Sequence, residues 1–405
     1  MSIADKLTLL INTKQDIKSA ISEKGVEVTG GMTTYADAIR RIETGGGGGG
    51  EGGDSIYVPV GLKFAYKYPP NSDTYNIPKF TLPKLILADG YTDGTYMFDG
   101  NESLTSINGI YSSNSSLIDC RYMFNNCISL ESILHLDSSN VTDMSYMFYN
   151  CKNLTTIPQM ITSNVTNMDY MFWKCSSLTT IPKLDTSNVV RMNGIFWNCA
   201  SLTTIPQLDT SSVTGMNSMF SECRSLTTIP QLDTSNVRSM NVMFEGCTSL
   251  TNVPQLDLSN VTTISGMFNG CTSLTTIPQL DTSNVIYMSG VFSGCFKLKS
   301  LPLLDTSKLE NRSHNLFDEP STSNIHPYPE LTDLGGFKNL KYDLKALNGM
   351  PNLTVQSLMN VINNLYDYKA NGSTVTRNFT IGNFNLRKLT DEQKAVAINK
   401  GWVLV

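Results

Sequence analysis

Residues 185–208 read DTSNVVRMNGIFWNCASLTTIPQL and residues 209–232 read DTSSVTGMNSMFSECRSLTTIPQL, so one pattern returns after 24 residues. Self-similarity at a short fixed period is typical of proteins that stack one structural unit many times. The clearest marker is a cysteine that recurs at intervals of 24, at Cys127, Cys151, Cys175, Cys199, Cys223, Cys247, Cys271 and Cys295. The sequence therefore predicts eight units in phase.

Each unit has the hydrophobic pattern of a short helix followed by a short strand. Met144, Met147, Phe148 and Cys151 stand at i, i+3, i+4 and i+7, the spacing of one helix face. Residues 154–158 are rich in β-branched side chains and end in proline, which favours a strand before a turn. A single unit cannot bury its own apolar face, so neighbours must stack. We therefore predict an α/β solenoid, a leucine-rich-repeat-like array of 24-residue units (short strand, turn, short helix).

The repeated block LDTSNVTxMxxMFxxCxSLTTIPQ resembles the BspA-type leucine-rich repeats of bacterial surface proteins and lipoproteins. The resemblance covers about residues 96–317. The first unit departs from the pattern, because Phe98 precedes Phe124 by 26 residues and Asn101 takes the cysteine place. The last unit drifts at residues 316–317, as is typical where an array meets its caps. The resemblance implies a solenoid that displays a broad repeat surface.

Residues 1–44 form a separate segment, for which we predict helices. Leu7, Leu10, Ile17 and Ile21 mark one face of the first helix, a face that suits a helical trimer. The string INTKQDIKSAISEKGVEVTGGMTTYADAIRRI resembles the N-terminal segments of tail-fibre and related virion proteins of tailed bacteriophages. The resemblance implies that this segment anchors the chain to other virion proteins and joins it into a homo-oligomer.

We divide the rest of the chain into four parts. Residues 45–53 are a glycine-rich linker, residues 54–95 an N-terminal cap, residues 96–317 the solenoid, and residues 318–405 a degenerate repeat with a C-terminal cap. The glycines are not followed by the Gly-Lys-Ser/Thr of a phosphate-binding loop, which argues against a nucleotide site there.

The C-terminal part carries helix signals. Thr354 is the predicted N-cap of a helix over residues 355–365, and Thr390 opens a capping box. Residues 402–405 are predicted as a last strand. These stretches resemble the closing segment of repeat proteins in phages of gut bacteria, and we expect them to shield the end of the core from water.

The charge pattern excludes some classes of partner. Formal net charge is −5, and acidic and basic residues are mixed along the chain, so no basic stripe is available for nucleic acid. No apolar run approaches the roughly 20 residues that cross a bilayer, so we expect no membrane insertion. The first residues lack the pattern of a secretory signal. We therefore expect assembly in a host cytoplasm and localisation in the virion, with the bacterial cell surface as the alternative.

Three polar columns follow the same period. The cysteines lack CxxC spacing, and the histidines are scattered, so we interpret the thiols as reduced core residues rather than as a metal site. Asparagines in phase resemble the buried asparagine ladder of leucine-rich repeats. The aspartates either hold calcium or close the following turn, and the absence of companion carboxylates favours the turn. They are Asp137, Asp185, Asp209, Asp233, Asp257, Asp281 and Asp305, with Ile161 as the exception. We expect no metal and no cofactor.

Aromatic side chains form the one surface feature with functional content. On a helical wheel they lie opposite the core face and should point to solvent. They are Tyr122, Tyr146, Tyr149, Tyr170, Trp173 and Trp197, and later units carry small or polar residues at these places. An exposed row of this kind is unusual for a free surface. We hypothesise that it contacts a glycan or protein of a host surface, or another virion chain. The alternative is rings that lie flat on polar neighbours.

No constellation of residues supports catalysis, so we predict a protein that is not an enzyme. Our leading interpretation is a structural virion protein of a tailed bacteriophage, a tail or head fibre or receptor-binding component. Its expected partners are other virion proteins and a host surface protein or glycan. The alternative is a bacterial cell-surface leucine-rich-repeat adhesin. A glycan hydrolase would need paired carboxylates in a cleft, and the regular aspartate column does not match that pattern.

Overall fold

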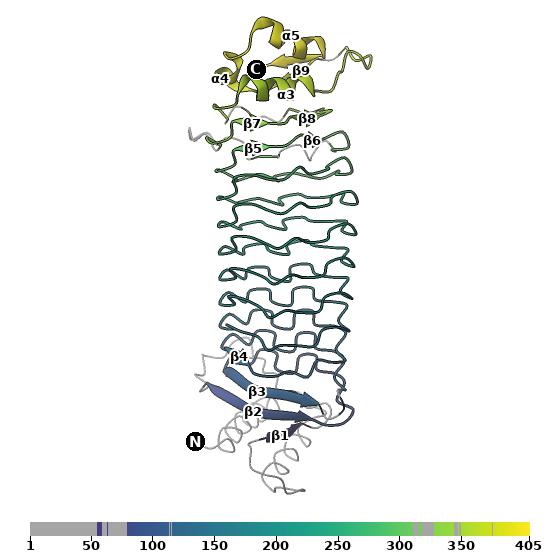
Figure 1. The fold of residues 1–405 in the computed structure, drawn as a ribbon, viewed down its shortest axis with the longest axis vertical. Helices are drawn as coiled ribbons and strands as arrows, with labels where there is room; N and C mark the ends of the chain where they lie inside the picture. Colours follow the sequence, from purple (N-terminus) through teal and green to yellow (C-terminus); the bar gives the residue numbers. More distant parts are fainter. Residues whose placement is uncertain are drawn as a thin grey trace, which may run out of the picture.

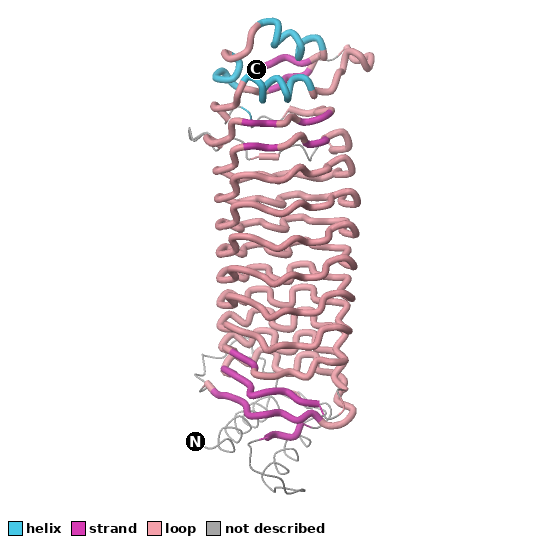
Figure 2. Tube along the Cα trace, viewed as in Figure 1, coloured by secondary structure: helices cyan, strands magenta, loops and turns pink. Residues whose placement is uncertain are grey.

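The computed structural model is a rod in which about 12 turns of chain stack into a β-solenoid (Figure 1). The stack begins at a small sheet near the N-terminus and ends under a cluster of helices at the C-terminus, with loop-like coils between them (Figure 2). The predicted stacked array is therefore confirmed. The structure describes residues 55–58, 63, 79–112, 114, 116–310, 316–317, 328–343, 347, 350–374 and 376–405.

A parallel sheet of four strands opens the solenoid, in the order β1-β2-β3-β4. The strands are β1 (Ser55–Val58), β2 (Phe80–Leu87), β3 (Leu104–Ser112) and β4 (Ser132–Ile133). Leu82, Ile107 and Ile133 are register partners across three of these strands, and all three are buried. The apolar interior of the repeats therefore begins in this sheet.

Beyond β4 the coils are joined by single bridges rather than by long strands. A bridge recurs every 24 residues, as between Asp143 and Asn167. Main-chain bonds between coils accompany it: the amide of Met144 donates to the carbonyl of Asn167 (3.0 Å), and the amide of Phe148 donates to that of Met171 (2.9 Å). The amides between them donate to carbonyls of their own coil. Successive backbone amides therefore alternate between an acceptor in the next coil and an acceptor in the same coil.

The segment predicted as a short helix is a run of tight turns. The amide of Cys151 donates to the carbonyl of Phe148, three residues back instead of the four of an α-helix. Tyr146 and Asn150 have φ of 57° and 61°, left-handed values foreign to a right-handed helix. The helix prediction was wrong, because successive turns send side chains inward at the same spacing as a helix face. Likewise, residues 154–158 do not form a regular strand.

A continuous apolar column fills the coils, as predicted. In residues 189–208 every apolar side chain at an inward position is at most 8% exposed, from Val189 to Leu208. The phenylalanine rings stack from coil to coil, with centroids 5.0 Å apart for Phe98 and Phe124. Because each coil buries its apolar face only against its neighbours, stability belongs to the stack rather than to any one repeat.

The cysteine column lies inside this core. All eight repeat thiols are fully buried, and each donates to the phenylalanine carbonyl of the preceding coil. Cys199 Sγ, for example, lies 3.1 Å from the carbonyl oxygen of Phe172. Burial raises the pKa of the seven repeat thiols from Cys127 to Cys271, that of Cys271 to about 12. The thiol is therefore both a packing group and a link between coils.

The asparagine column also links coils, but at the surface rather than in the interior. Asn188 Nδ2 donates to the carbonyl of Ser163 (2.8 Å), and Asn236 Nδ2 donates to that of Ser211 (2.7 Å). These asparagines are exposed, so the expected burial of the ladder was wrong although its hydrogen bonding is present. Ser212 replaces asparagine in one coil and reaches the carbonyl of Ser187 with its hydroxyl (3.1 Å).

Two pairs of short parallel strands and a group of helices close the C-terminal end (Figure 1). The pairs are β5 (Ser300–Leu301) with β7 (Asp333–Leu334), and β6 (Leu304–Asp305) with β8 (Phe337–Lys338). The remaining elements are α3 (Val355–Asn363), β9 (Arg377–Phe379), α4 (Gly382–Leu386), α5 (Asp391–Asn399) and β10 (Trp402–Leu404).

The predicted caps of this end are confirmed. Thr354 Oγ1 accepts from the amide of Ser357 at the start of α3 (3.1 Å). Thr390 and Gln393 form the capping box of α5. Strand β10 pairs in parallel with β9, and Trp402 is buried there at 1% exposure. Helix α3 thus lies against β7 and β8 of the last coils, and β10 packs against β9 and α5.

The predicted anchor face of Leu7, Leu10, Ile17 and Ile21 and the linker of residues 45–53 lie outside the described residues. Within the described residues, no helix has the length and apolar character needed to cross a membrane.

The buried thiols give a first prediction. At about pH 8, where an ordinary cysteine reacts readily, the native chain should leave its repeat cysteines unlabelled by a small thiol reagent, because burial disfavours the thiolate. Labelling should begin only on unfolding. A Lys297→Cys variant, at an exposed position, is the matched control and should add one fast-reacting thiol. Rapid labelling of several thiols in the folded protein would contradict the buried column.

Candidate functional site

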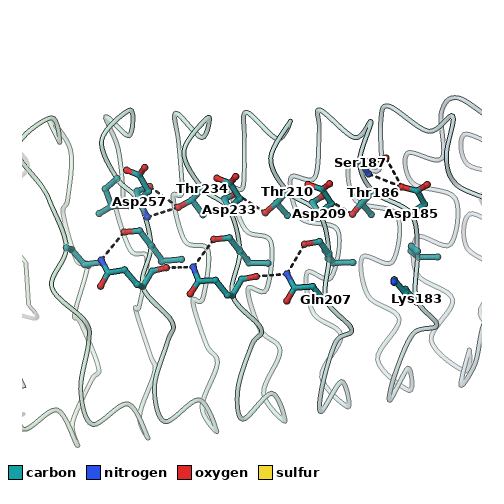
Figure 3. A pocket seen from close by; sticks show the side chains of 18 of the residues that line it. Lys183, Asp185, Thr186, Ser187, Gln207, Asp209, Thr210, Asp233, Thr234 and Asp257 are labelled. Atoms are coloured by element: carbon teal, nitrogen blue, oxygen red, sulfur yellow. Dashed lines mark hydrogen bonds between the residues drawn. The ribbon is translucent and has the colours of Figure 1, made fainter.

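A groove runs across successive coils on one side of the solenoid (Figure 3). Its volume is about 1630 Å³, and the coils between Gln159 and Asp305 line it, together with Lys338. Gln207, Asp209 and Thr210 line it from one coil, and most of the other coils supply at least two of these three residue types at the same places. The groove is therefore made of columns that repeat at the spacing of the coils.

The threonine hydroxyls and glutamine amides of the groove donate to acceptors within the protein. Thr186 Oγ1 donates to the carbonyl of Asp209 in the next coil (2.8 Å), and Gln207 Nε2 donates to that of Gln231 (2.6 Å). The same bonds recur along both columns. The groove thus presents mainly carboxylate and amide oxygens to solvent.

Each aspartate of the groove closes an Asx turn, which confirms the turn interpretation. Asp209 Oδ1 accepts from the amide of Ser211 (3.0 Å) and from its hydroxyl (2.6 Å). The serine hydroxyl, then the serine amide, hold the pKa of Asp185, Asp209 and Asp233 below its usual value. These carboxylates therefore stay ionised well into the acid range.

The ends of the aspartate column are chemically different. Ile161 takes the aspartate place near the N-terminal end and is 58% exposed. At the other end Lys338 Nζ lies 2.7 Å from Asp305 Oδ2. Within the described part of the chain, no three His, Cys, Asp or Glu side chains gather as metal ligands.

The predicted aromatic residues lie together in two adjacent columns, and none of them lines the groove. With the tyrosine of the first unit they form what we call the aromatic stripe: Tyr96, Tyr122, Tyr146, Tyr149, Tyr170, Trp173 and Trp197. In the first column the centroids of successive tyrosine rings are 4.9, 4.7 and 4.9 Å apart. In the second, Tyr149, Trp173 and Trp197 follow one another at 4.5 Å.

Stacking changes what the aromatic stripe presents to solvent. The six predicted residues are half-buried, and Tyr96 at the free end is 44% exposed. The rings do not project singly, as the helical wheel suggested, because each leans on the ring of the next coil. Burial, followed by the neighbouring Tyr122 and Tyr170, raises the pKa of Tyr146 to about 12. The stripe thus offers ring edges along its length and ring faces at its ends.

The tyrosines of the aromatic stripe occupy strained backbone positions. Tyr122, Tyr146 and Tyr170 have φ between 56° and 58°, and the same place in a later coil is Gly266 with φ of 63°. A left-handed conformation costs a non-glycine residue about 1–2 kcal/mol. A stacked aromatic pair contributes about 0.5–1.5 kcal/mol beyond burial, which offsets much of that strain. Large side chains are thus kept where glycine fits best.

Lys174 is a residue of this surface that sequence reasoning missed. Its ammonium lies 5.0 Å from the Trp173 ring centroid and 5.5 Å from that of Tyr149. It too has a left-handed φ, of 64°, at a place that Gly246 fills in a later coil. The sequence did carry a signal for this position. The repeat column that contains Lys174 otherwise holds mostly asparagine and glycine, which are the residues that favour a left-handed backbone.

The stacked coils and their buried Met, Phe, Cys and Leu columns define a solenoid of the leucine-rich type. A model of the family described as "Mycoplasma protein of unknown function, DUF285" matches residues 92–204, 177–275 and 247–326. Together these matches cover more than half of the chain, so the chain belongs to this family. No curated protein matches the sequence significantly.

Three bacterial leucine-rich repeat proteins are among the solved structures that this chain is similar to. A leucine-rich repeat protein of T. pallidum is 19% identical over 60% of this chain and 83% of its own, with a TM-score of 0.26. One from Eubacterium ventriosum is 18% identical over 52% and 82%, with a TM-score of 0.34. A leucine rich cell surface protein of Faecalibacterium prausnitzii is 21% identical over 67% and 86%, with a TM-score of 0.33.

The aspartate turns predict a pH dependence of stability. Because the folded pKa is lowered, the stabilisation is complete above the ordinary value near 3.8 and is lost as pH falls through the folded pKa. The triple variant Asp185→Asn, Asp209→Asn, Asp233→Asn should therefore show a shallower fall of Tm below that value. Asp391→Asn, whose side chain is 97% exposed, is the control. An identical pH profile for the triple variant and the wild type would refute the assignment.

Proposed function

We propose that this chain is a non-enzymatic binding protein that presents its solenoid to a partner, with the aromatic stripe as the principal contact. The observation that carries the proposal is the set of tyrosines kept at left-handed positions in consecutive coils. Residues held in sparsely populated backbone conformations cluster at functional sites. Later coils of the same solenoid place Gly194, Ser218, Val242, Gly266 and Gly290 there, so the fold itself does not require tyrosine.

Two further features support a binding role. Aromatic side chains dominate the energetics of protein contacts, because they bury a large area with few rotatable bonds. Lys174 adds a cation beside the two rings it contacts, which gives the surface a polar component. By contrast, the aspartates of the groove are regular elements of the turns, which argues against a catalytic carboxylate pair there.

The setting that we propose is the virion of a tailed bacteriophage, where the chain serves as a tail or head fibre or receptor-binding component. The support is the resemblance of residues 1–44 to the N-terminal segments of such proteins. In this proposal that segment contacts other virion proteins and forms a homo-oligomer, for which the face of Leu7, Leu10, Ile17 and Ile21 suits a trimer. The solenoid then faces the host surface.

The second candidate is a bacterial cell-surface adhesin. The resemblance of the repeats to BspA-type proteins favours it, since those repeats occur on bacterial surface proteins and lipoproteins. Both candidates use the repeat surface for attachment, and they differ in the structure that carries the chain.

The location test separates the two candidates. If the proposal holds, mass spectrometry of purified virions from a lysate should detect this chain at the copy number of a structural component. Antibody labelling should then decorate the same particles. Recovery of the chain from the cell envelope, with none in the virions, would establish the adhesin instead.

The attachment test addresses the aromatic stripe. The double variant Trp173→Ser, Trp197→Ser removes the two stacked indoles, and we expect attachment of the labelled protein to host cells to fall about tenfold or more, as for the loss of a central aromatic contact. Tm should fall only modestly, because the buried core is untouched. Tyr287→Ser removes an aromatic side chain that is 42% exposed outside the stripe, and it should leave attachment unchanged. Attachment of the double variant at the wild-type level would contradict the proposal.

A further inference from the structure

The carboxylates of the groove form a row with one carboxylate per coil. Asp209, Asp233 and Asp257, which we call the central carboxylates, are exposed and lie in successive coils (Figure 3). In such a stack their spacing is that of neighbouring strands, about 4.8 Å. Each uses Oδ1 in its Asx turn, where it accepts from the serine amide two residues on. Among the described residues, Oδ2 of each central carboxylate accepts no hydrogen bond and forms no ion pair.

The lysines that line the groove lie toward its two ends. Lys183 lies beside Asp185 in the coils before the central carboxylates (Figure 3), and Lys338 reaches Asp305 in the coils after them. Between them the threonine hydroxyls and glutamine amides already donate to carbonyls of the protein. The middle of the groove therefore presents negative charge and hydrogen-bond acceptors. A cleft lined by one sign of charge raises the local concentration of ions of the opposite sign.

The chain itself places an ammonium group in this groove. Lys338 Nζ lies 2.7 Å from Oδ2 of Asp305, while Oδ1 of the same carboxylate accepts from the amide of Ser307 (2.9 Å). Asp305 belongs to the same column as Asp209 and closes the same Asx turn. The free oxygen of a column carboxylate can therefore hold an ammonium group without opening the turn. Lys338 thus shows which chemical group the column accepts.

We propose that the groove binds a linear polyamine, with one ammonium group on the free Oδ2 of each central carboxylate. Charge-assisted hydrogen bonds of this kind are stronger than bonds between neutral groups. Single bonds of about 1.5 Å place two amines that are separated by three methylenes about 5 Å apart, which is close to the spacing of the coils. The methylene chain between the amines then runs along the groove, across successive coils. Each ammonium group binds as that of Lys338 does at the end of the column.

Two other cationic ligands fit this row less well. A calcium ion needs at least six oxygens around one point, whereas in the part of the chain that the structure describes no three His, Cys, Asp or Glu side chains gather. Side chains on one face of an extended peptide recur at about 6.8 Å, twice the rise per residue, so successive lysines would fall out of step with the coils. Amine binding is also separate from attachment through the aromatic stripe, because none of the stripe residues lines the groove.

The probe is norspermidine, a triamine with three methylenes in each link. Titration calorimetry of the whole chain at neutral pH and low ionic strength, where charges are least screened, should give a dissociation constant of about 1 mM or lower. Homospermidine carries the same charge with four methylenes in each link, and it should bind severalfold more weakly. The absence of norspermidine binding, or equal affinity for the two triamines, would overturn the inference.

A triple variant places the amine on the central carboxylates. Asp209→Asn, Asp233→Asn and Asp257→Asn together remove the charge of the row but keep a side-chain oxygen for each Asx turn. Because one exposed ion pair changes affinity by about a factor of two, the loss of three should weaken norspermidine binding about tenfold. A measured Tm confirms that the variant is folded. Wild-type affinity in the folded triple variant would exclude the groove as the amine site.

Two controls distinguish a groove site from other ways of binding a cation. The first control removes three exposed charges outside the groove and should bind nearly as wild type: Glu102→Gln, Glu131→Gln and Asp391→Asn. Equal losses in the two triple variants would show a general effect of net charge and would overturn the inference. The second control is the double variant Trp173→Ser, Trp197→Ser, which should bind norspermidine normally. A loss of binding there would place the amine on the rings of the aromatic stripe instead, as a cation–π contact.

Discussion

In the turn segment of each coil, alternate backbone amides donate to the next coil, and the rest of the structure depends on these hydrogen bonds. The amide of Phe148 reaches the carbonyl of Met171, and that of Phe172 reaches the carbonyl of Ile195, so the coils lie in fixed register. In such a stack every side chain sits over its counterpart at about the spacing of neighbouring strands, roughly 4.8 Å. Side chains at equivalent positions therefore form columns. Whether a residue type stabilises the stack depends on how it packs against the same residue type in the next coil.

Three solutions to that constraint coexist in the chain. Phenylalanine rings stack in the interior, where their faces match at the coil spacing. Cysteine fills the narrow place beside them and gives its thiol proton to a carbonyl that already accepts a turn amide, as Phe172 does from Cys175 and Cys199. The repulsion between neighbouring aspartates of the column is outweighed by the hydrogen bonds that one carboxylate oxygen of each accepts in its Asx turn. Each column thus has its own chemistry, compatible with the same backbone.

The period, the core column and the aspartate turns were predictable, because each depends on a residue type repeated in phase. The helix was not, since an inward spacing of i, i+3, i+4 and i+7 at Met144 to Cys151 fits both a helix and a run of turns. The distinguishing signal lay in the left-handed positions, where asparagine and glycine alternate with Tyr146 and Lys174. The half-burial of the aromatic stripe was missed for the same reason, because a helix would have pointed these rings into solvent. The position of Lys338 at the end of the groove depends on packing between coils, which one sequence cannot reveal.

The alternation of amide partners has a consequence for how such a chain changes in evolution. A coil bonds only to the coils before and after it, so one whole unit can be duplicated or deleted without disturbing the register elsewhere. An insertion or deletion of any other number of residues would put the side chains of every column out of register. Length is therefore adjustable in whole coils, whereas the boundary between large rings and small side chains at Trp197 is a single landmark. Adding whole coils after Trp197 lengthens the rod while that landmark stays at a constant distance from the N-terminal sheet.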